Sequence, residues 1–239
     1  MKTFRIGGVH PAENKLSAAE PIKVAELPKV AVFPMGQHIG APAVPCVQKG
    51  DKVKVGTQIG KPMEKALSTS IFSSVSGTVL KVDTVVDASG YKKPAIYITV
   101  EGDEWEESID RTDKLVTLKD KPELTPEEII EKVKNAGVVG MGGACFPTHV
   151  KLMPPPQFKP EWVIINAVEC EPYLTADHRL MLEKADEVLV GVELLMKAAK
   201  VTKGFIGIEE NKPDAIKLLS EKCAAGHPNI EVVPLKTKY

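Results

Sequence analysis

The sequence predicts an α/β domain with a parallel sheet in its C-terminal half, joined to an all-β barrel-sandwich domain in its N-terminal half. Two patterns along the 239 residues support this fold class. Residues 30–100 contain short runs of β-branched residues separated by glycine, proline and aspartate, as in small β-barrels. From residue 125 onward, apolar runs of strand length alternate with helical periodicity, which is typical of a parallel sheet with crossover helices. We therefore expect domains at 1–115 and 120–239.

Composition narrows the classes of protein that the chain can represent. The 31 basic and 32 acidic residues nearly cancel, so we expect no nucleic-acid partner. No apolar run approaches the ~20 residues of a membrane span, and the chain reaches Gly7 without the apolar core of a signal peptide. The four cysteines form no C-x-x-C pair, and we interpret them as reduced thiols of a cytoplasmic protein.

The first 30 residues form an irregular lead, in which His10 is interpreted as a turn residue and not as a metal ligand.

Strands are expected in the barrel at Val30–Phe33, Val53–Val55, Gly77–Val82 and Ala95–Val100. The glycine pattern of residues 49–60, with Ser76-Gly77-Thr78-Val79, resembles biotinyl and lipoyl carrier folds, which are flattened barrels. Lys65 is out of register with the modified lysine of those carriers and lacks flanking methionines. We therefore interpret the barrel as a structural or docking module without a covalent group.

A linker and a helix are expected next. Residues 101–124 carry dense mixed charge, and Trp105 should anchor this linker to one domain. Thr125, Pro126 and Glu128 together have the pattern of a helix start with a capping box. Gly137 stands where a left-handed residue would end that helix.

The candidate binding loop is the glycine-rich stretch Gly137–Lys151. Glycines allow backbone N–H groups to surround a phosphate without interference from Cβ atoms, and Lys151 adds a positive charge. A buried strand is expected at Trp162–Val168, ending in the polar run 169–172, which could meet a ribose or the edge of a ring. A glycine turn that only packs closely is the alternative interpretation.

The remaining elements complete a strand–helix–strand–helix–strand order. They are a helical region at Thr175–Lys200, which Gly191 or the Ala185-Asp186 junction would divide, a strand at Phe205–Ile208, a helix at 213–224 and a strand at Ile230–Val233. Ligands of such sheets bind beyond the carboxyl ends of the strands. Residues 166–171 and 209–211 both fall at those ends.

Two strings in this half resemble a known family. The pattern Gly140-x-Gly-Gly-Ala-x-Phe-Pro-Thr-x-x-Lys151, followed by Asn166-x-x-Glu169-x-Glu171-Pro172, resembles the flavin- and NADH-binding subunit of respiratory complex I. Residues 166–175, together with Gly-Gly-Val-His-Pro at 7–11, are more similar to the C subunit of the Rnf electron-transport complex. The resemblance covers essentially the whole chain.

This resemblance implies a Rossmann-like domain of the complex I flavoprotein type that binds FMN noncovalently and exchanges a hydride with NAD(H). Gly140, Gly142, Gly143, Lys151, Asn166 and Glu169 would bind FMN, and Phe146 and Glu171 would receive NADH. Val168 replaces an aspartate of the complex I pattern, and Pro154 replaces a second aromatic residue. Core packing is an equal alternative for Phe146. Cys145 and Cys170 are interpreted as buried spectators, because two thiols are too few for an iron–sulfur cluster.

The resemblance also implies a peripheral subunit of an ion-translocating ferredoxin:NAD oxidoreductase on the cytoplasmic side of the bacterial inner membrane. Other subunits would be its partners, ferredoxin an indirect one, and two [4Fe–4S] clusters would lie in polypeptide beyond Tyr239. We expect such a truncated chain to bind FMN poorly. The alternatives are a non-catalytic docking module with a degenerate nucleotide fold, and a part of a sodium-pumping quinone reductase that is similar to its A subunit.

Overall fold

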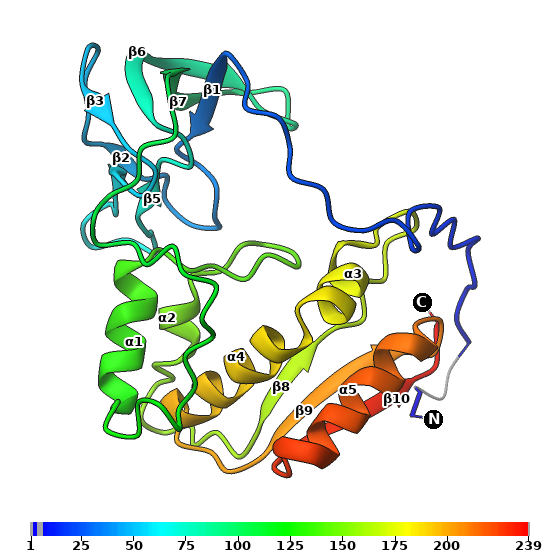
Figure 1. Cartoon of the computed structure of the whole chain (residues 1–239). Helices are drawn as coiled ribbons and strands as arrows, with labels where there is room; N and C mark the ends of the chain where they lie inside the picture. The colour runs from blue at the N-terminus through cyan, green and yellow to red at the C-terminus, as the bar shows by residue number, and fades with distance from the viewer. Residues whose placement is uncertain (1, 4–6, 239) are drawn as a thin grey trace. The chain divides into compact units, whose positions relative to one another are not determined.

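A computed structural model describes residues 2–3 and 7–238, which fold into two compact units, each assembled from separate stretches of chain (Figure 1). The α/β unit comprises Met1–Val24, Leu115–Ile129 and Pro154–Tyr239. The barrel unit comprises Ala25–Lys114 and Ile130–Met153. The division at 115–120 remains a prediction of domain organisation, since the compact units do not follow the chain linearly.

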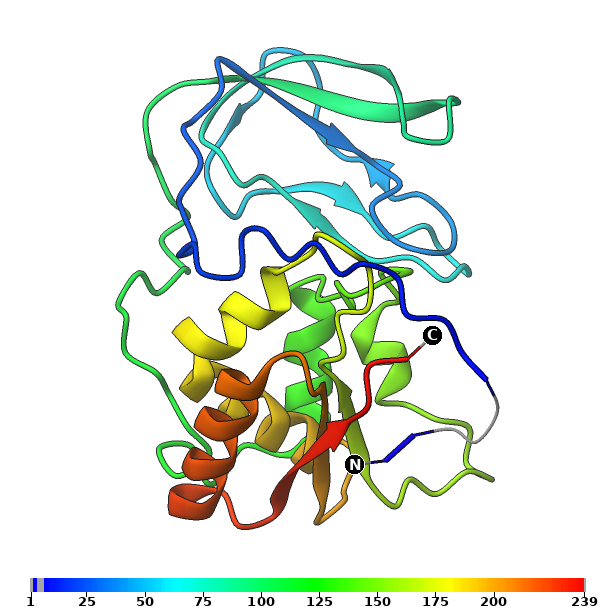
Figure 2. The same ribbon diagram turned by 90° about the vertical axis from the view of Figure 1, so that its right-hand side faces the viewer.

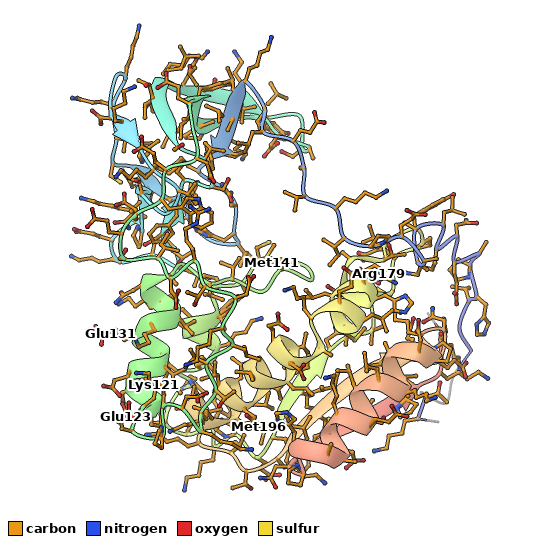
Figure 3. All side chains as sticks on the ribbon, viewed as in Figure 1. Lys121, Glu123, Glu131, Met141, Arg179 and Met196 are labelled. Atoms are coloured by element: carbon orange, nitrogen blue, oxygen red, sulfur yellow. The ribbon has the colours of Figure 1, made fainter. Side chains whose placement is uncertain are left out.

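The α/β unit is built on a three-stranded parallel sheet with the strand order β10-β9-β8. In chain order its elements are β8 (Val163–Asn166), α3 (Ala176–Glu183), α4 (Ala185–Ala198), β9 (Gly204–Glu209), α5 (Pro213–Gly226) and β10 (Ile230–Leu235). The three helices pack on one face of the sheet (Figure 2), where Leu189, Ile206 and Leu219 are fully buried. Met196 of α4, labelled in Figure 3, belongs to the same core. The predicted parallel sheet with helical connections is confirmed.

The long helical region predicted between β8 and β9 is interrupted once. Lys184 has φ −130° and ψ 35°, which ends α3 and begins α4. The interruption adjoins the predicted Ala185-Asp186 junction. Gly191 instead lies within α4, where a Cβ would have open space.

β8 differs from the buried strand that the sequence predicts. It is an edge strand, and its residues alternate between partly buried and exposed. Val163 and Ile165 pack against the helix-covered core, whereas the side chain of Ile164 is 67% exposed. Successive side chains of a strand point to opposite faces, so covering one face with helices leaves Ile164 outside. The prediction of burial along the whole strand was wrong.

The barrel unit contains two antiparallel sheets with strand orders β1-β7-β6-β3 and β2-β4-β5. Its strands are β1 (Val30–Pro34), β2 (Val44–Pro45), β3 (Lys52–Val53), β4 (Gln58–Lys61), β5 (Ile71–Phe72), β6 (Gly77–Val86) and β7 (Lys92–Val100). Residues of both sheets form one core, with Ile59, Ile96 and Ile98 fully buried. Strands occur at all four predicted positions, and Trp105 anchors the linker as predicted by pairing with Val55.

Helix α1 (Pro126–Asn135) begins and ends as its sequence predicts. The Thr125 N–H donates to Glu128 Oε2 at 2.7 Å and the Glu128 N–H donates to Thr125 Oγ1 at 3.2 Å, which completes the capping box. Gly137 then adopts φ +67°, and the Val138 N–H donates back to Val133 O. None of the helices in the described part of the chain is long and apolar enough to cross a membrane.

Candidate functional site

The predicted site residues fall in both compact units. The glycine loop, Phe146 and Lys151 belong to the barrel unit, whereas Asn166, Glu169 and Glu171 belong to the α/β unit. Each group has its own geometry, and the roles predicted for these residues remain predictions.

The glycine loop is closed at its base by a short antiparallel bridge. The Gly140 N–H donates to Phe146 O and the Thr148 N–H donates to Val138 O, both at 3.0 Å. The tip of the loop extends into solvent, and the side chain of Met141 is 88% exposed (Figure 3). A fixed base therefore presents an exposed tip.

The backbone at the tip is uncovered. Within the described residues, the N–H groups of Met141, Gly142 and Gly143 have no hydrogen-bond acceptor. A Cβ built on Gly142 or Gly143 would meet no heavy atom within 4 Å, and neither residue has a positive φ. Backbone geometry therefore does not require glycine at these two positions. What glycine contributes there is N–H surface that a ligand can approach closely.

The side chain of Lys151 lies against the same loop. It ends α2 (Thr148–Lys151), a single helical turn, and its Nζ would lie 2.9 Å from a Cβ built on Gly140. The same Nζ lies 5.8 Å from the centre of the ring of Phe146, which is partly buried. The structure thus brings Gly140, Phe146 and Lys151 together and places a positive charge at the base of the open N–H groups.

The turn that carries Lys151 also buries a histidine to which the sequence analysis assigned no role. His149 is 7% exposed, and its Nδ1 has no hydrogen-bond partner among the described residues. Burial lowers the pKa of His149, and the charge of Lys134 acts in the same direction. The neutral form of His149 is therefore favoured in the folded protein.

In the α/β unit, β8 ends at Asn166 and the chain turns toward α3. We call residues 168–174 the strand-end turn. Asn166 Oδ1 accepts a hydrogen bond from the Val168 N–H at 3.1 Å, as in an Asx-turn. The Glu169 carboxylate accepts hydrogen bonds from the N–H groups of Asp177 at 2.6 Å and His178 at 3.3 Å, and so caps α3. The side chain of Glu171 is exposed.

Two lysines that the sequence analysis missed hold the backbone of the strand-end turn. Lys15 Nζ donates to the carbonyl oxygens of Glu169 and Glu171 at 2.9 Å each, and to that of Leu174 at 2.7 Å. Lys212 Nζ donates to Val168 O at 2.7 Å. Lys15 is separated from Glu169 by 154 positions in the sequence, and no local pattern indicates such a contact.

Lys212 belongs to a buried charged group at the carboxyl ends of β8 and β9. Its side chain is 2% exposed, and its Nζ lies 3.9 Å from Glu209 Oε2. Burial lowers the pKa of Lys212 and raises the pKa of Glu209. Burial and the nearby charge of Glu169 raise the pKa of Asp177. This edge of the sheet therefore holds several charges away from solvent, as strand ends that bind ligands often do.

The two cysteines near these segments are not buried. Cys145 is partly exposed and Cys170 is exposed. The predicted burial was wrong for both residues. Within the described residues, no group of three or more histidine, cysteine or acidic side chains is arranged to hold a metal ion.

Two family models match the chain. Residues 2–103 match the RnfC barrel sandwich hybrid domain, and residues 133–239 match the Nuo51 FMN-binding domain. The first match confirms the predicted class of the N-terminal domain.

Several relatives are similar over nearly the whole chain, and each is the C subunit of an ion-translocating complex. That of the proton-translocating ferredoxin:NAD(+) oxidoreductase complex of Clostridium ljungdahlii is 46% identical, with 100% of this chain and 50% of that protein covered. That of the Na(+)-translocating complex of Acetobacterium woodii is 44% identical, with 99% and 52% covered. That of the ion-translocating oxidoreductase complex of Pseudomonas aeruginosa is 37% identical, with 96% and 29% covered. The chain thus spans about half the length of the first two relatives.

Among solved structures, an NAD+-reducing [NiFe]-hydrogenase in the air-oxidized state aligns with a TM-score of 0.41 and 23% identity. The alignment covers 47% of this chain and 21% of that one. A likeness at this level carries no functional conclusion.

Proposed function

This chain belongs to the RnfC family, the C subunits of ion-translocating oxidoreductase complexes, and on that premise we propose that it is an electron-transfer flavoprotein subunit. It binds FMN noncovalently and supports hydride exchange between NAD(H) and FMN. The observation that carries this proposal is the set of uncovered N–H groups at Met141, Gly142 and Gly143, with Lys151 beside the base of their loop.

The glycine loop fits the phosphate end of FMN. Unpaired backbone N–H groups and an ammonium group together favour an anion. The open space around Gly142 and Gly143 allows an oxygen to approach the backbone directly. Gly140, Gly142, Gly143 and Lys151 would bind the phosphate and ribityl chain, and Phe146 would offer a stacking face to NADH.

The strand-end turn of the α/β unit offers polar groups of its own to a nucleotide ligand. It follows the carboxyl end of β8 in a parallel sheet of order β10-β9-β8, which supports a Rossmann-like domain of the complex I flavoprotein type. Asn166 would donate its side-chain amide to FMN, and Glu171 would accept hydrogen bonds from NAD(H). Glu169 would act nearby, in addition to capping α3.

FMN, when bound, supplies the hydride-accepting ring, and the protein supplies binding, orientation and electrostatics. The names of the relatives extend the proposal to a complex that links ferredoxin and NAD. We infer that other subunits are the direct partners, that ferredoxin is an indirect one, and that the chain lies peripherally on the cytoplasmic side of the bacterial membrane. The two [4Fe–4S] clusters would be held outside the 239 residues of this chain.

Because we expect a truncated chain to bind FMN poorly, titration of the full-length subunit with FMN and then NADH tests the proposal. Lys151→Ala should weaken FMN binding about tenfold or more, since a charge-assisted hydrogen bond contributes about 1.5–3 kcal/mol. Glu171→Ala should weaken NADH binding and leave FMN affinity unchanged. Lys49→Ala and Glu221→Ala, at exposed positions, are the matched controls.

Unchanged affinities in both Lys151→Ala and Glu171→Ala would remove the assigned site. A full-length wild-type subunit that binds neither FMN nor NADH would instead favour the docking-module alternative.

A further inference from the structure

Lys15 lies on the irregular lead of the first 30 residues, outside the segments in which the sequence predicts site residues. We propose that Lys15 is a positioning residue, which holds the strand-end turn in the conformation that presents Glu171 to NAD(H). It acts through backbone carbonyls and does not touch the ligand. This inference rests on the proposed function and adds to it a residue outside the two matched motifs.

The three hydrogen bonds of Lys15 use the full donor capacity of its side chain. An ammonium group has three N–H donors, and Lys15 Nζ donates to the carbonyls of Glu169, Glu171 and Leu174. No donor is left for a phosphate or a carboxylate. The geometry therefore indicates a clamp on the backbone and excludes direct ligand binding in this arrangement.

The lead is itself fixed alongside the turn, so that Lys15 acts from a defined position. The Tyr173 N–H donates to Glu13 O at 2.9 Å, two residues before Lys15. Ser17 is two residues after Lys15, and its Oγ lies 2.7 Å from Thr175 Oγ1. Farther along, Arg179 of α3, labelled in Figure 3, donates to a carbonyl of the lead. These contacts bracket Lys15 on both sides.

The clamped turn has a backbone conformation that requires such support. Glu169 and Tyr173 adopt φ values of +49° and +69°. A left-handed conformation is unfavourable for a residue other than glycine. Lys15 holds the carbonyls of Glu169 and of Leu174, the residue after Tyr173, while Lys212 holds Val168 O. Without Lys15, we expect residues 169–174 to relax and Glu171 to lose its fixed position.

The test compares Lys15→Met, which keeps the aliphatic stem, with Lys15→Arg, which restores positive N–H donors. Lys23→Met is the matched control on the same segment, since the side chain of Lys23 is 76% exposed and contacts only Glu20 among the described residues. The readouts are FMN affinity, the KM for NADH of the FMN-loaded protein with ferricyanide as electron acceptor, and hydrogen exchange of the peptide around Tyr173.

Lys15→Met should raise the KM for NADH about tenfold or more, because charged hydrogen bonds hold the backbone next to Glu171. FMN affinity should fall by a smaller factor than the KM for NADH rises, since Glu169 is the one proposed FMN residue in the turn that Lys15 holds, and its carboxylate is also fixed by the N–H groups of Asp177 and His178. Exchange of the Tyr173 amide should accelerate in the same variant. Lys15→Arg should recover part of the KM, and Lys23→Met should match the wild type in all three readouts.

An unchanged KM and unchanged Tyr173 exchange in Lys15→Met would overturn the inference while leaving the proposed function intact. Equal losses of FMN and NADH binding with a lowered melting temperature would also overturn it, because they would show general destabilisation of the unit. A full-length wild-type subunit that does not bind FMN would refute the proposed function first, and the positioning role would fall with it.

Discussion

Replacing Gly143 by alanine distinguishes a ligand-binding loop from a glycine turn that only packs. The added Cβ would meet no protein atom within 4 Å, and Gly143 does not have a positive φ. The free energy of unfolding should therefore change by less than about 1 kcal/mol, with any change tending toward stabilisation. A bound phosphate would meet the new methyl group directly. Loss of one charge-assisted hydrogen bond of about 1.5–3 kcal/mol corresponds to roughly 10- to 150-fold weaker FMN binding.

The assay is quenching of flavin fluorescence on titration of the full-length subunit, combined with thermal unfolding of the apo-protein. Gly36→Ala is the matched control, since Gly36 also lies in the barrel unit, lacks a positive φ and has open space around a Cβ. Both variants should unfold at nearly the wild-type temperature, and only Gly143→Ala should bind FMN weakly. Equal FMN affinities for wild type and Gly143→Ala would refute the interpretation of the tip as a phosphate site.

Three further changes test other parts of the structure. Gly137→Ala should lower the free energy of unfolding by roughly 2–4 kcal/mol, because alanine would need φ +67° and its Cβ would lie 2.6 Å from Ser70 O; a urea denaturation midpoint equal to that of the wild type would contradict this. Burial lowers the folded-state pKa of His149 below its usual value of about 6.5, so its contribution to stability is present above that pH and is lost as the pH falls through the folded pKa. Melting temperatures of His149→Gln between pH 8 and 5 should consequently decline less than those of the wild type, and parallel curves would argue against the effect. Glu169→Ala should cost about 1 kcal/mol by removing the cap of α3, with the exposed Glu171→Ala as control; identical melting curves would show that the cap contributes nothing.

Local patterns predicted most of the secondary structure. The start of α1 followed from Thr125, Pro126 and Glu128, because a capping box is formed by residues three apart and needs no tertiary contact. The exposure of Ile164 did not follow, since an apolar run does not reveal whether one face or both faces of its strand will be covered.

The candidate site was predictable only in part. The glycine loop and the polar strand end are continuous strings of sequence with a recognisable pattern. Lys15 and Lys212 were missed because each binds backbone carbonyls, which every residue carries, and because the contact of Lys15 spans 154 positions. The local sequence around such a lysine is the same whether its side chain faces solvent or binds a turn that is distant in the sequence.

The contacts of the lead also bear on how the protein is made. The α/β unit joins stretches that are far apart in the sequence, since Lys2 pairs with Leu235 and Lys15 with the turn after β8. A ribosome releases the lead long before these partners emerge, and contacts of such high sequence separation form slowly. The α/β unit should therefore remain incompletely folded until β10 has been synthesised.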